Sequence, residues 1–211
     1  MRKVAIILSV LMIFSFTLLS QTRVFETNKI GIISFLKMYC SYGELNPTHQ
    51  EETDRVNHFI QKIFDKQYTS DDIPDLITQS LQLFYDNSIS ELDDSLDFTR
   101  MITRRSMCLI VLAFLSGELN LPSFWFLTDA RQNLNRLNSD LNGRMMLIVN
   151  IVELYTDLSW KYASKKGIEY KVAQYKDDLK NRKNDISDKN FIAEYEEILL
   201  KVTISIRELE K

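Results

Sequence analysis

Apolar and polar positions along this chain repeat with helical spacing over most of its length. Residues 29–41 are apolar on most sides and predict a short buried helix. Pro47 marks the start of the next helix, and Thr48 to Glu51 matches a capping box. Behind it, apolar residues three and four apart share one face: Val56, Phe59, Ile60, Ile63 and Phe64.

Two further helices are predicted before the middle of the chain. Residues 70–74 begin the first, whose apolar face consists of Ile73, Leu76, Ile77, Leu81 and Phe84. Residues 88–91 form a second capping box, and the helix behind it is expected to run to Ser116. Gly117 is expected to stop that helix, because glycine is common just after a helix end.

The longest predicted element begins at Pro122. Apolar residues from Leu134 to Tyr162 follow one another with gaps of three and four, and the pattern continues through Asn142-Gly143. We therefore predict one helix across that glycine, despite a cost of about 1 kcal/mol. Residues 165–167, two lysines and a glycine, are expected to end it, because cations are favoured at helix C-termini.

Two more helices are predicted over residues 168–179 and 192–209, with a polar break at 184–190. The chain has only five glycines and three prolines, whereas strand-and-turn proteins use many of both. The predicted fold class is all-α: a bundle of about six to seven helices around one long central helix. Residues 21–211 are expected to form a single domain, and no internal repeat is visible.

The N-terminus has the layout of a secretory signal peptide. Arg2 and Lys3 precede an apolar run over residues 4–19, and Ser20 is a small residue before a cleavage site. A spanning helix needs about 20 apolar residues, so this run is short for a membrane anchor. We therefore predict a signal peptide over residues 1–20 and an exported protein, periplasmic or extracellular. The alternative is an uncleaved N-terminal anchor, in which case the protein contacts the membrane.

Charge narrows the class of partner. The whole chain has 26 basic and 29 acidic residues, a formal net charge of −3. Residues 1–20 contain two of the basic residues and none of the acidic ones, so the net charge of the rest is −5. A nucleic-acid binder needs a basic stripe to neutralise phosphates, so this class is disfavoured. A basic protein partner or a metal cation is compatible with the balance.

Two acidic segments are candidates for metal chemistry: DDIPD, with Asp71, Asp72 and Asp75, and DDSLD, with Asp93, Asp94 and Asp97. They are similar to the DDxxD motif with which helical prenyl-diphosphate and terpene synthases hold magnesium. The first departs from that motif because Pro74 places it at a helix start, where acidic residues are favoured for capping. We transfer no roles from this resemblance, and a metal-binding protein or small exported enzyme that uses these aspartates is the alternative function.

Cys40 and Cys108 are the only cysteines, and both lie in apolar runs of the exported part. In an oxidising compartment they can form a disulfide, and the alternative is two free buried thiols. His49 and His58 are the only histidines, and we interpret them as surface residues.

Phe124, Trp125 and Phe126 form the densest aromatic cluster. Three consecutive helical positions cannot all face one way, so at least one is a candidate to contact a partner. No nucleophile motif, glycine-rich phosphate loop or cofactor site is apparent. The sequence favours an exported, non-enzymatic helical protein that binds another macromolecule, expected to be a protein: an inhibitor or immunity-type protein, an envelope assembly factor or a scaffold.

Overall fold

The computed structural model describes residues 26–41, 50–85, 95–137, 139–160 and 164–208. Within these ranges the structure is all-helical and contains no strand, which confirms the all-α part of the predicted fold class. The predicted signal peptide lies outside the described residues, as do His49, Asp93 and Asp94. In the part of the chain that is described, no helix is both long and apolar enough to cross a membrane.

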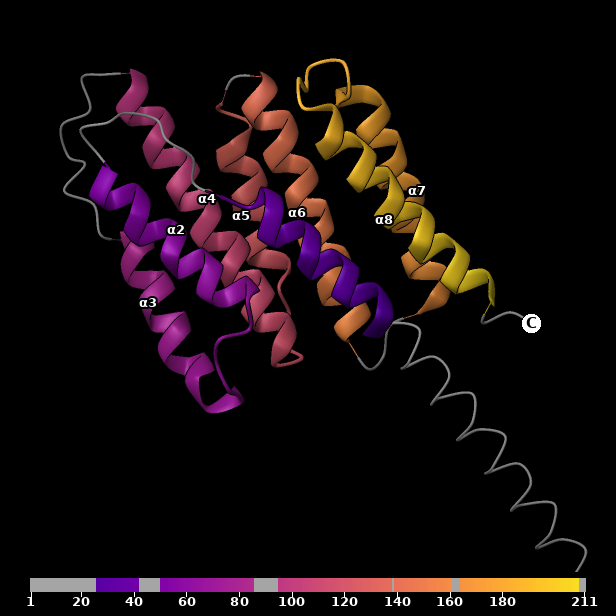
Figure 1. Cartoon of the computed structure of the whole chain (residues 1–211), viewed down its shortest axis with the longest axis horizontal. Helices are drawn as coiled ribbons and strands as arrows, with labels where there is room; N and C mark the ends of the chain where they lie inside the picture. The colour runs from indigo at the N-terminus through magenta and orange to yellow at the C-terminus, as the bar shows by residue number, and fades with distance from the viewer. Residues whose placement is uncertain (1–25, 42–49, 86–94, 138, 161–163, 209–211) are drawn as a thin grey trace, which may run out of the picture.

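The first helix covers residues 26–39. The others are α2 (Gln50–Phe64), the short 3₁₀ turn η2 (Ser70–Asp72), α3 (Ile73–Tyr85), α4 (Ser95–Glu118), α5 (Phe124–Leu134), α6 (Ser139–Ser159), α7 (Lys165–Arg182) and α8 (Lys189–Glu208). Figure 1 shows α2 and α3 on one side of the molecule and α7 and α8 on the other, with α4, α5 and α6 between them.

The central helix of the structure is α4. Residues 106–117 are all buried, and a helix that is apolar on every side can be accommodated only among other helices. Accordingly α4 contacts α2, α3, α5 and α6. A long central helix is therefore present, but it is this element and not the one predicted to begin at Pro122.

The predicted helix across Asn142-Gly143 is confirmed within α6, but the expectation that it begins at Pro122 is wrong, because α5 ends at Leu134 and α6 begins at Ser139. The side-chain amide of Asn142 donates a hydrogen bond to the carbonyl oxygen of Leu134 at 2.9 Å, which satisfies the exposed end of α5. One straight helix over residues 124–159 would be about 54 Å long. The turn instead lets α6 lie against both α4 and α5.

Lys165, Lys166 and Gly167 were expected at a helix end, but they begin α7. The hydroxyl oxygen of Ser164 accepts a hydrogen bond from the Gly167 backbone N–H at 3.0 Å, so serine is the N-cap of this helix. The polar break that follows is confirmed, since α7 ends at Arg182 and α8 begins at Lys189.

The predicted face of α2 is confirmed, and α8 also buries residues at helical spacing. All five residues predicted for α2 are buried, as are Tyr195, Leu199, Val202 and Ile206 on α8. The face of α3 differs, because Leu81 is exposed while Ser80 is buried. The Ser80 hydroxyl donates to the backbone oxygen of Cys108 at 3.1 Å, and this bond makes a serine compatible with the α3–α4 contact.

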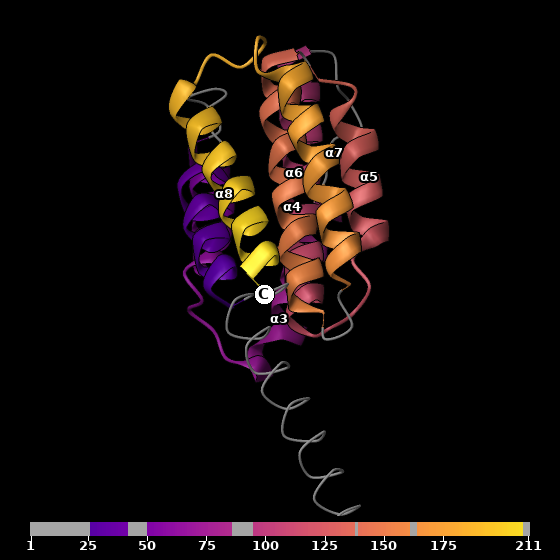
Figure 2. The same cartoon turned by 90° about the vertical axis from the view of Figure 1, so that its right-hand side faces the viewer.

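The first helix lies against the last one. Phe35 contacts Phe191 and Tyr195 of α8, with ring centroids 5.2 and 6.3 Å apart. Tyr39 meets Phe191 edge-on at 5.1 Å. Figure 2 shows α8 and the N-terminal helices on one side of the molecule, with α5, α6 and α7 on the other. Segments from opposite ends of the sequence thus share one aromatic cluster.

Candidate functional site

The chain reverses sharply after α4, and this corner positions the predicted aromatic residues. Asn120 adopts a positive φ of 55°, a conformation that asparagine tolerates better than most residues. Its N–H bonds the carbonyl of Gly117, and the N–H of Leu121 bonds that of Ser116 at 2.8 Å. This pair of bonds is a Schellman motif, which ends α4 and directs the chain into α5.

Gly117 does not itself provide this stop, contrary to the prediction. It lies inside α4 and faces Thr156 of α6, where a β-carbon would come within 2.8 Å of Thr156 Cγ2. Glycine is therefore required for the close approach of the two helices, and Asn120 occupies the left-handed position after the helix end.

Among the described residues, several large apolar side chains are exposed around this corner, and four of them are more than 40% exposed. Their exposed fractions are 72% for Trp125, 59% for Phe124, 51% for Leu121 and 44% for Trp160. Phe124 and Trp125 meet edge-on with ring centroids 5.6 Å apart. We call Leu121, Phe124, Trp125 and Trp160 the aromatic corner. Phe126, the third predicted residue, is half-buried and packs against the core.

A small pocket opens within the aromatic corner, with a volume of about 150 Å³. Four helices, α4 to α7, and the turn before α5 contribute to it. Its apolar walls include Leu121, Phe124 and Trp160, and its ionisable groups are Glu153 and Asp157 of α6 and Lys171 of α7. An apolar rim thus surrounds a charged floor, the layout typical of a specific binding site.

The charged floor is held together by ion pairs between helices. Lys171 Nζ lies 2.9 Å from Glu153 Oε1 and 2.6 Å from Asp157 Oδ2. Glu153 Oε2 is paired with Arg131 of α5, which also donates to Asn150 Oδ1 at 3.1 Å. These bonds join α5, α6 and α7 and fix the orientation of both carboxylates.

The two carboxylates of the pocket respond differently to burial. Burial raises the pKa of Glu153, but Arg131 and Lys171 outweigh it and hold the pKa below its ordinary value. Burial also raises the pKa of Asp157, and here Lys171 offsets only part of the effect, while the Glu153 charge raises the pKa further. Asp157 is therefore the carboxylate whose negative charge is incompletely compensated.

The predicted acidic segments do not form a metal centre among the described residues, in which no group of three metal-ligating side chains occurs. The Asp72 carboxylate accepts hydrogen bonds from the backbone and hydroxyl of Thr69 at 2.7 and 2.9 Å. It therefore caps η2, and these bonds from Thr69 lower its pKa. Asp71 and Asp75 lie in the exposed first turns of η2 and α3. Asp97 lies on α4, and its side chain is outside the description.

Cys40 and Cys108 are both buried and free in the structure. Cys40 Sγ lies 4.0 Å from the sulfur of Met107, the neighbour of Cys108. The two cysteines therefore belong to adjoining parts of the core, and a thiol count decides between the two alternatives, a disulfide and two free thiols.

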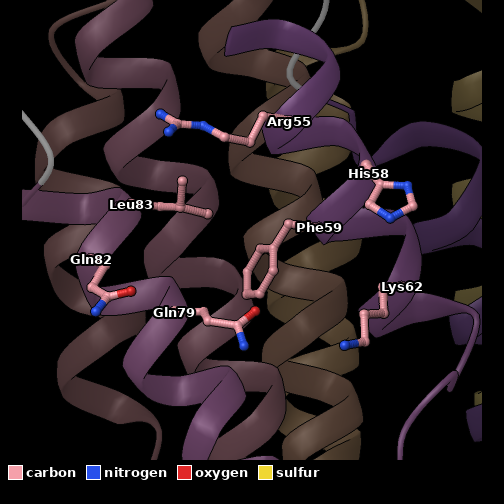
Figure 3. A pocket seen from close by; sticks show the side chains of 7 residues that line it. All are labelled: Arg55, His58, Phe59, Lys62, Gln79, Gln82 and Leu83. Atoms are coloured by element: carbon pink, nitrogen blue, oxygen red, sulfur yellow. The ribbon is translucent and has the colours of Figure 1, made fainter. Parts of the chain in front are cut away.

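A larger groove of about 780 Å³ lies between α2 and α3. Figure 3 shows Arg55, His58 and Lys62 on α2, with Gln79, Gln82 and Leu83 on α3 and Phe59 between the helices. The basic groups extend along about 10 Å of helix and do not converge, and Arg55 has another partner within the chain. The corner pocket, whose charged groups do converge, is therefore the stronger candidate.

Sequence reasoning identified Phe124 and Trp125 but missed Trp160 and the charged floor. A signal for the floor was present, because Glu153 and Asp157 stand four residues apart within the most buried stretch of α6. Carboxylates are rarely buried without partners, so they predict cations from neighbouring helices. Comparison with protein-family models, curated proteins and solved structures finds no match to this chain.

Proposed function

We propose that this chain is an exported, non-enzymatic protein with a single helical-bundle domain, which acts by binding another protein through the aromatic corner. The observation that carries the proposal is the simultaneous exposure of Phe124 and Trp125 on α5 and of Trp160, which directly follows α6. Tryptophan is the residue most enriched among those that dominate binding energies at protein interfaces.

The surroundings of these side chains support the proposal. Ser123 Oγ donates to Thr156 Oγ1 at 3.1 Å, and Leu127 behind the rim is fully buried. The start of α5 is thus anchored to α6, and the exposed rings stand on a rigid base. The aromatic corner therefore loses little conformational entropy when a partner binds there.

Charge supports a protein partner over a nucleic acid. The chain is acidic overall, and the pocket floor has two carboxylates for one lysine. Phosphates would be repelled by such a surface, whereas a protein with apolar and basic side chains would complement it.

The test is a binding measurement with matched variants. A protein captured from the native envelope is purified and titrated against the parent, Trp125→Ala and Leu200→Ala. Leu200 on α8 is similarly exposed, at 54%, and lies outside the corner. We expect at least tenfold weaker binding for Trp125→Ala, about 1.4 kcal/mol, and no change for Leu200→Ala. Equal loss in both variants, or none in either, would refute the aromatic corner as the binding surface.

Export is tested separately by mass spectrometry of the protein expressed in its native host. A mature N-terminus at Gln21 in the periplasm or medium is the expected result. An intact Met1 on membrane-bound material would instead establish the N-terminal anchor.

A further inference from the structure

We propose that the pocket of the aromatic corner receives one arginine side chain of the partner protein, an assignment that rests on the proposed function. Four observations carry it: an acceptor oxygen without a partner among the described residues, a carboxylate that shares its cation with a second one, two aromatic walls and the size of the pocket.

The open acceptor is Asp157 Oδ1. Both oxygens of Glu153 are paired, one with Arg131 and one with Lys171. Asp157 uses Oδ2 for Lys171, and no hydrogen bond to its Oδ1 occurs among the described residues. Since Asp157 lines the pocket, an incoming donor can reach this oxygen.

The charge of the pocket favours a cation. Arg131 and Lys171 both pair with Glu153, whereas Lys171 is the one cation paired with Asp157 among the described residues. Burial raises the pKa of Asp157 in spite of Lys171, so a second cation would be stabilised there. A neutral or anionic side chain would leave this charge uncompensated and further desolvated.

The walls and the size of the pocket favour the guanidinium of an arginine side chain over other cations. Small-molecule sites usually span about 300–1,000 Å³, whereas this pocket of about 150 Å³ accommodates a single side chain. Phe124 and Trp160 provide aromatic surfaces, and tryptophan is the best partner in cation–π contacts. The guanidinium of arginine can stack on such a ring while it donates to a carboxylate, and it is more weakly hydrated than the ammonium of lysine.

The chain contains a built-in reporter for this test. It has only two tryptophans, so the indole N–H signals of Trp125 and Trp160 can be separated by nitrogen-15 NMR. The probe is N-acetyl-arginine methylamide, and its uncharged control is the citrulline analogue of the same shape. The expected result is a saturable shift of the Trp160 signal with the arginine probe, at least fivefold weaker with citrulline, and little change at Trp125.

Two asparagine variants complete the design. Asp157→Asn removes the open acceptor charge, and we expect at least fivefold weaker binding of the probe. Asp129→Asn removes the same charge from an exposed site on α5 outside the pocket, and binding should stay within twofold. The dispersion of the amide spectrum shows directly whether each variant is folded.

The outcomes separate this inference from the proposed function. No saturable Trp160 shift, an equal shift with citrulline, or unchanged binding in folded Asp157→Asn overturns the arginine assignment. The proposed function survives those results if Trp125→Ala still abolishes partner binding. Conversely, if the probe binds as expected but Trp125→Ala leaves partner binding intact, the proposed function fails and the assignment fails with it.

Discussion

Gly117 of α4 faces Thr156 of α6 at a distance that leaves no room for a β-carbon, which would lie 2.8 Å from Thr156 Cγ2. The same threonine accepts a hydrogen bond from Ser123 Oγ and donates one to the backbone oxygen of Glu153 at 2.9 Å. One contact therefore sets both the spacing of the two helices and the anchoring of the aromatic corner.

Gly117→Ala is expected to lower the free energy of unfolding by about 1–3 kcal/mol, because α4 and α6 must move apart. The loss should occur although alanine is the better helix former by about 1 kcal/mol. Thr156→Ser removes the clashing methyl group and keeps the hydroxyl, so the double variant should recover most of the stability. Urea denaturation measures this, and purely additive effects in the double variant would contradict the clash.

Glu153→Gln and Asp157→Asn should differ in their pH dependence. At pH 7, Glu153→Gln is expected to cost about 2 kcal/mol, because it weakens two charged hydrogen bonds. Asp157→Asn should cost less, because burial raises the pKa of Asp157 and its charged form is poorly compensated.

The sign follows from linkage. The pKa of Glu153 is lowered, so its contribution to stability is present above the unfolded pKa and is lost as the pH falls through the folded one. The pKa of Asp157 is raised, so its contribution is present below the unfolded pKa and declines as the pH rises through the folded one. The deficit of Glu153→Gln relative to the parent should therefore shrink as the pH falls, whereas that of Asp157→Asn should grow. Denaturation curves between pH 3 and 8 would contradict this if both deficits moved together.

Lys66 and Glu118 should be strongly coupled. Lys66 Nζ pairs with Glu118 and lies 3.1 Å from the hydroxyl of Tyr155, which donates to the same carboxylate. Burial lowers the pKa of Lys66, and Glu118 offsets only part of this effect. Glu118→Gln should cost about 2 kcal/mol because it leaves a half-buried ammonium poorly paired, whereas Lys66→Met combined with Glu118→Gln should cost less than that. A double-mutant cycle without coupling energy would refute this account.

The two thiols should be unreactive until the protein unfolds. Burial raises the pKa of both Cys40 and Cys108 to about 12, so almost no thiolate is present at pH 8. We expect no reaction with Ellman's reagent in the native state and two thiols per chain in guanidinium without reductant. No thiols in guanidinium, and two after reduction, would establish the predicted disulfide instead.

Helical periodicity predicted the fold class well because a buried face and a buried helix both require apolar residues at fixed spacing. It failed where contacts between helices decide the outcome. Leu134, Leu137 and Leu141 continue one stripe through a turn, since residues on either side of the turn face the same core. The prediction that the helix continues through Gly143 is confirmed, since Gly143 lies within α6, where a β-carbon would come within 3.2 Å of Ile186.

The sequence predicted only part of the candidate site, because the rest depends on contacts between helices. The run of aromatic residues at the start of α5 is a local signal, and it predicted Phe124 and Trp125. Trp160 and Lys171 reach the pocket from other helices, and no local pattern specifies which helices meet. Asp157 could be suspected from the sequence, but its unpaired oxygen depends on the geometry of α7.

The aromatic contact between Phe35 and Phe191 has a consequence for how the chain folds. The first helix cannot complete its packing until the last helix has been synthesised, because its ring partners lie near the far end of the sequence. Contacts of such high sequence separation slow folding, since a long loop must close before they form. If the chain is exported unfolded, as proposed above, this delay keeps its N-terminal part open until the C-terminal helix has been synthesised.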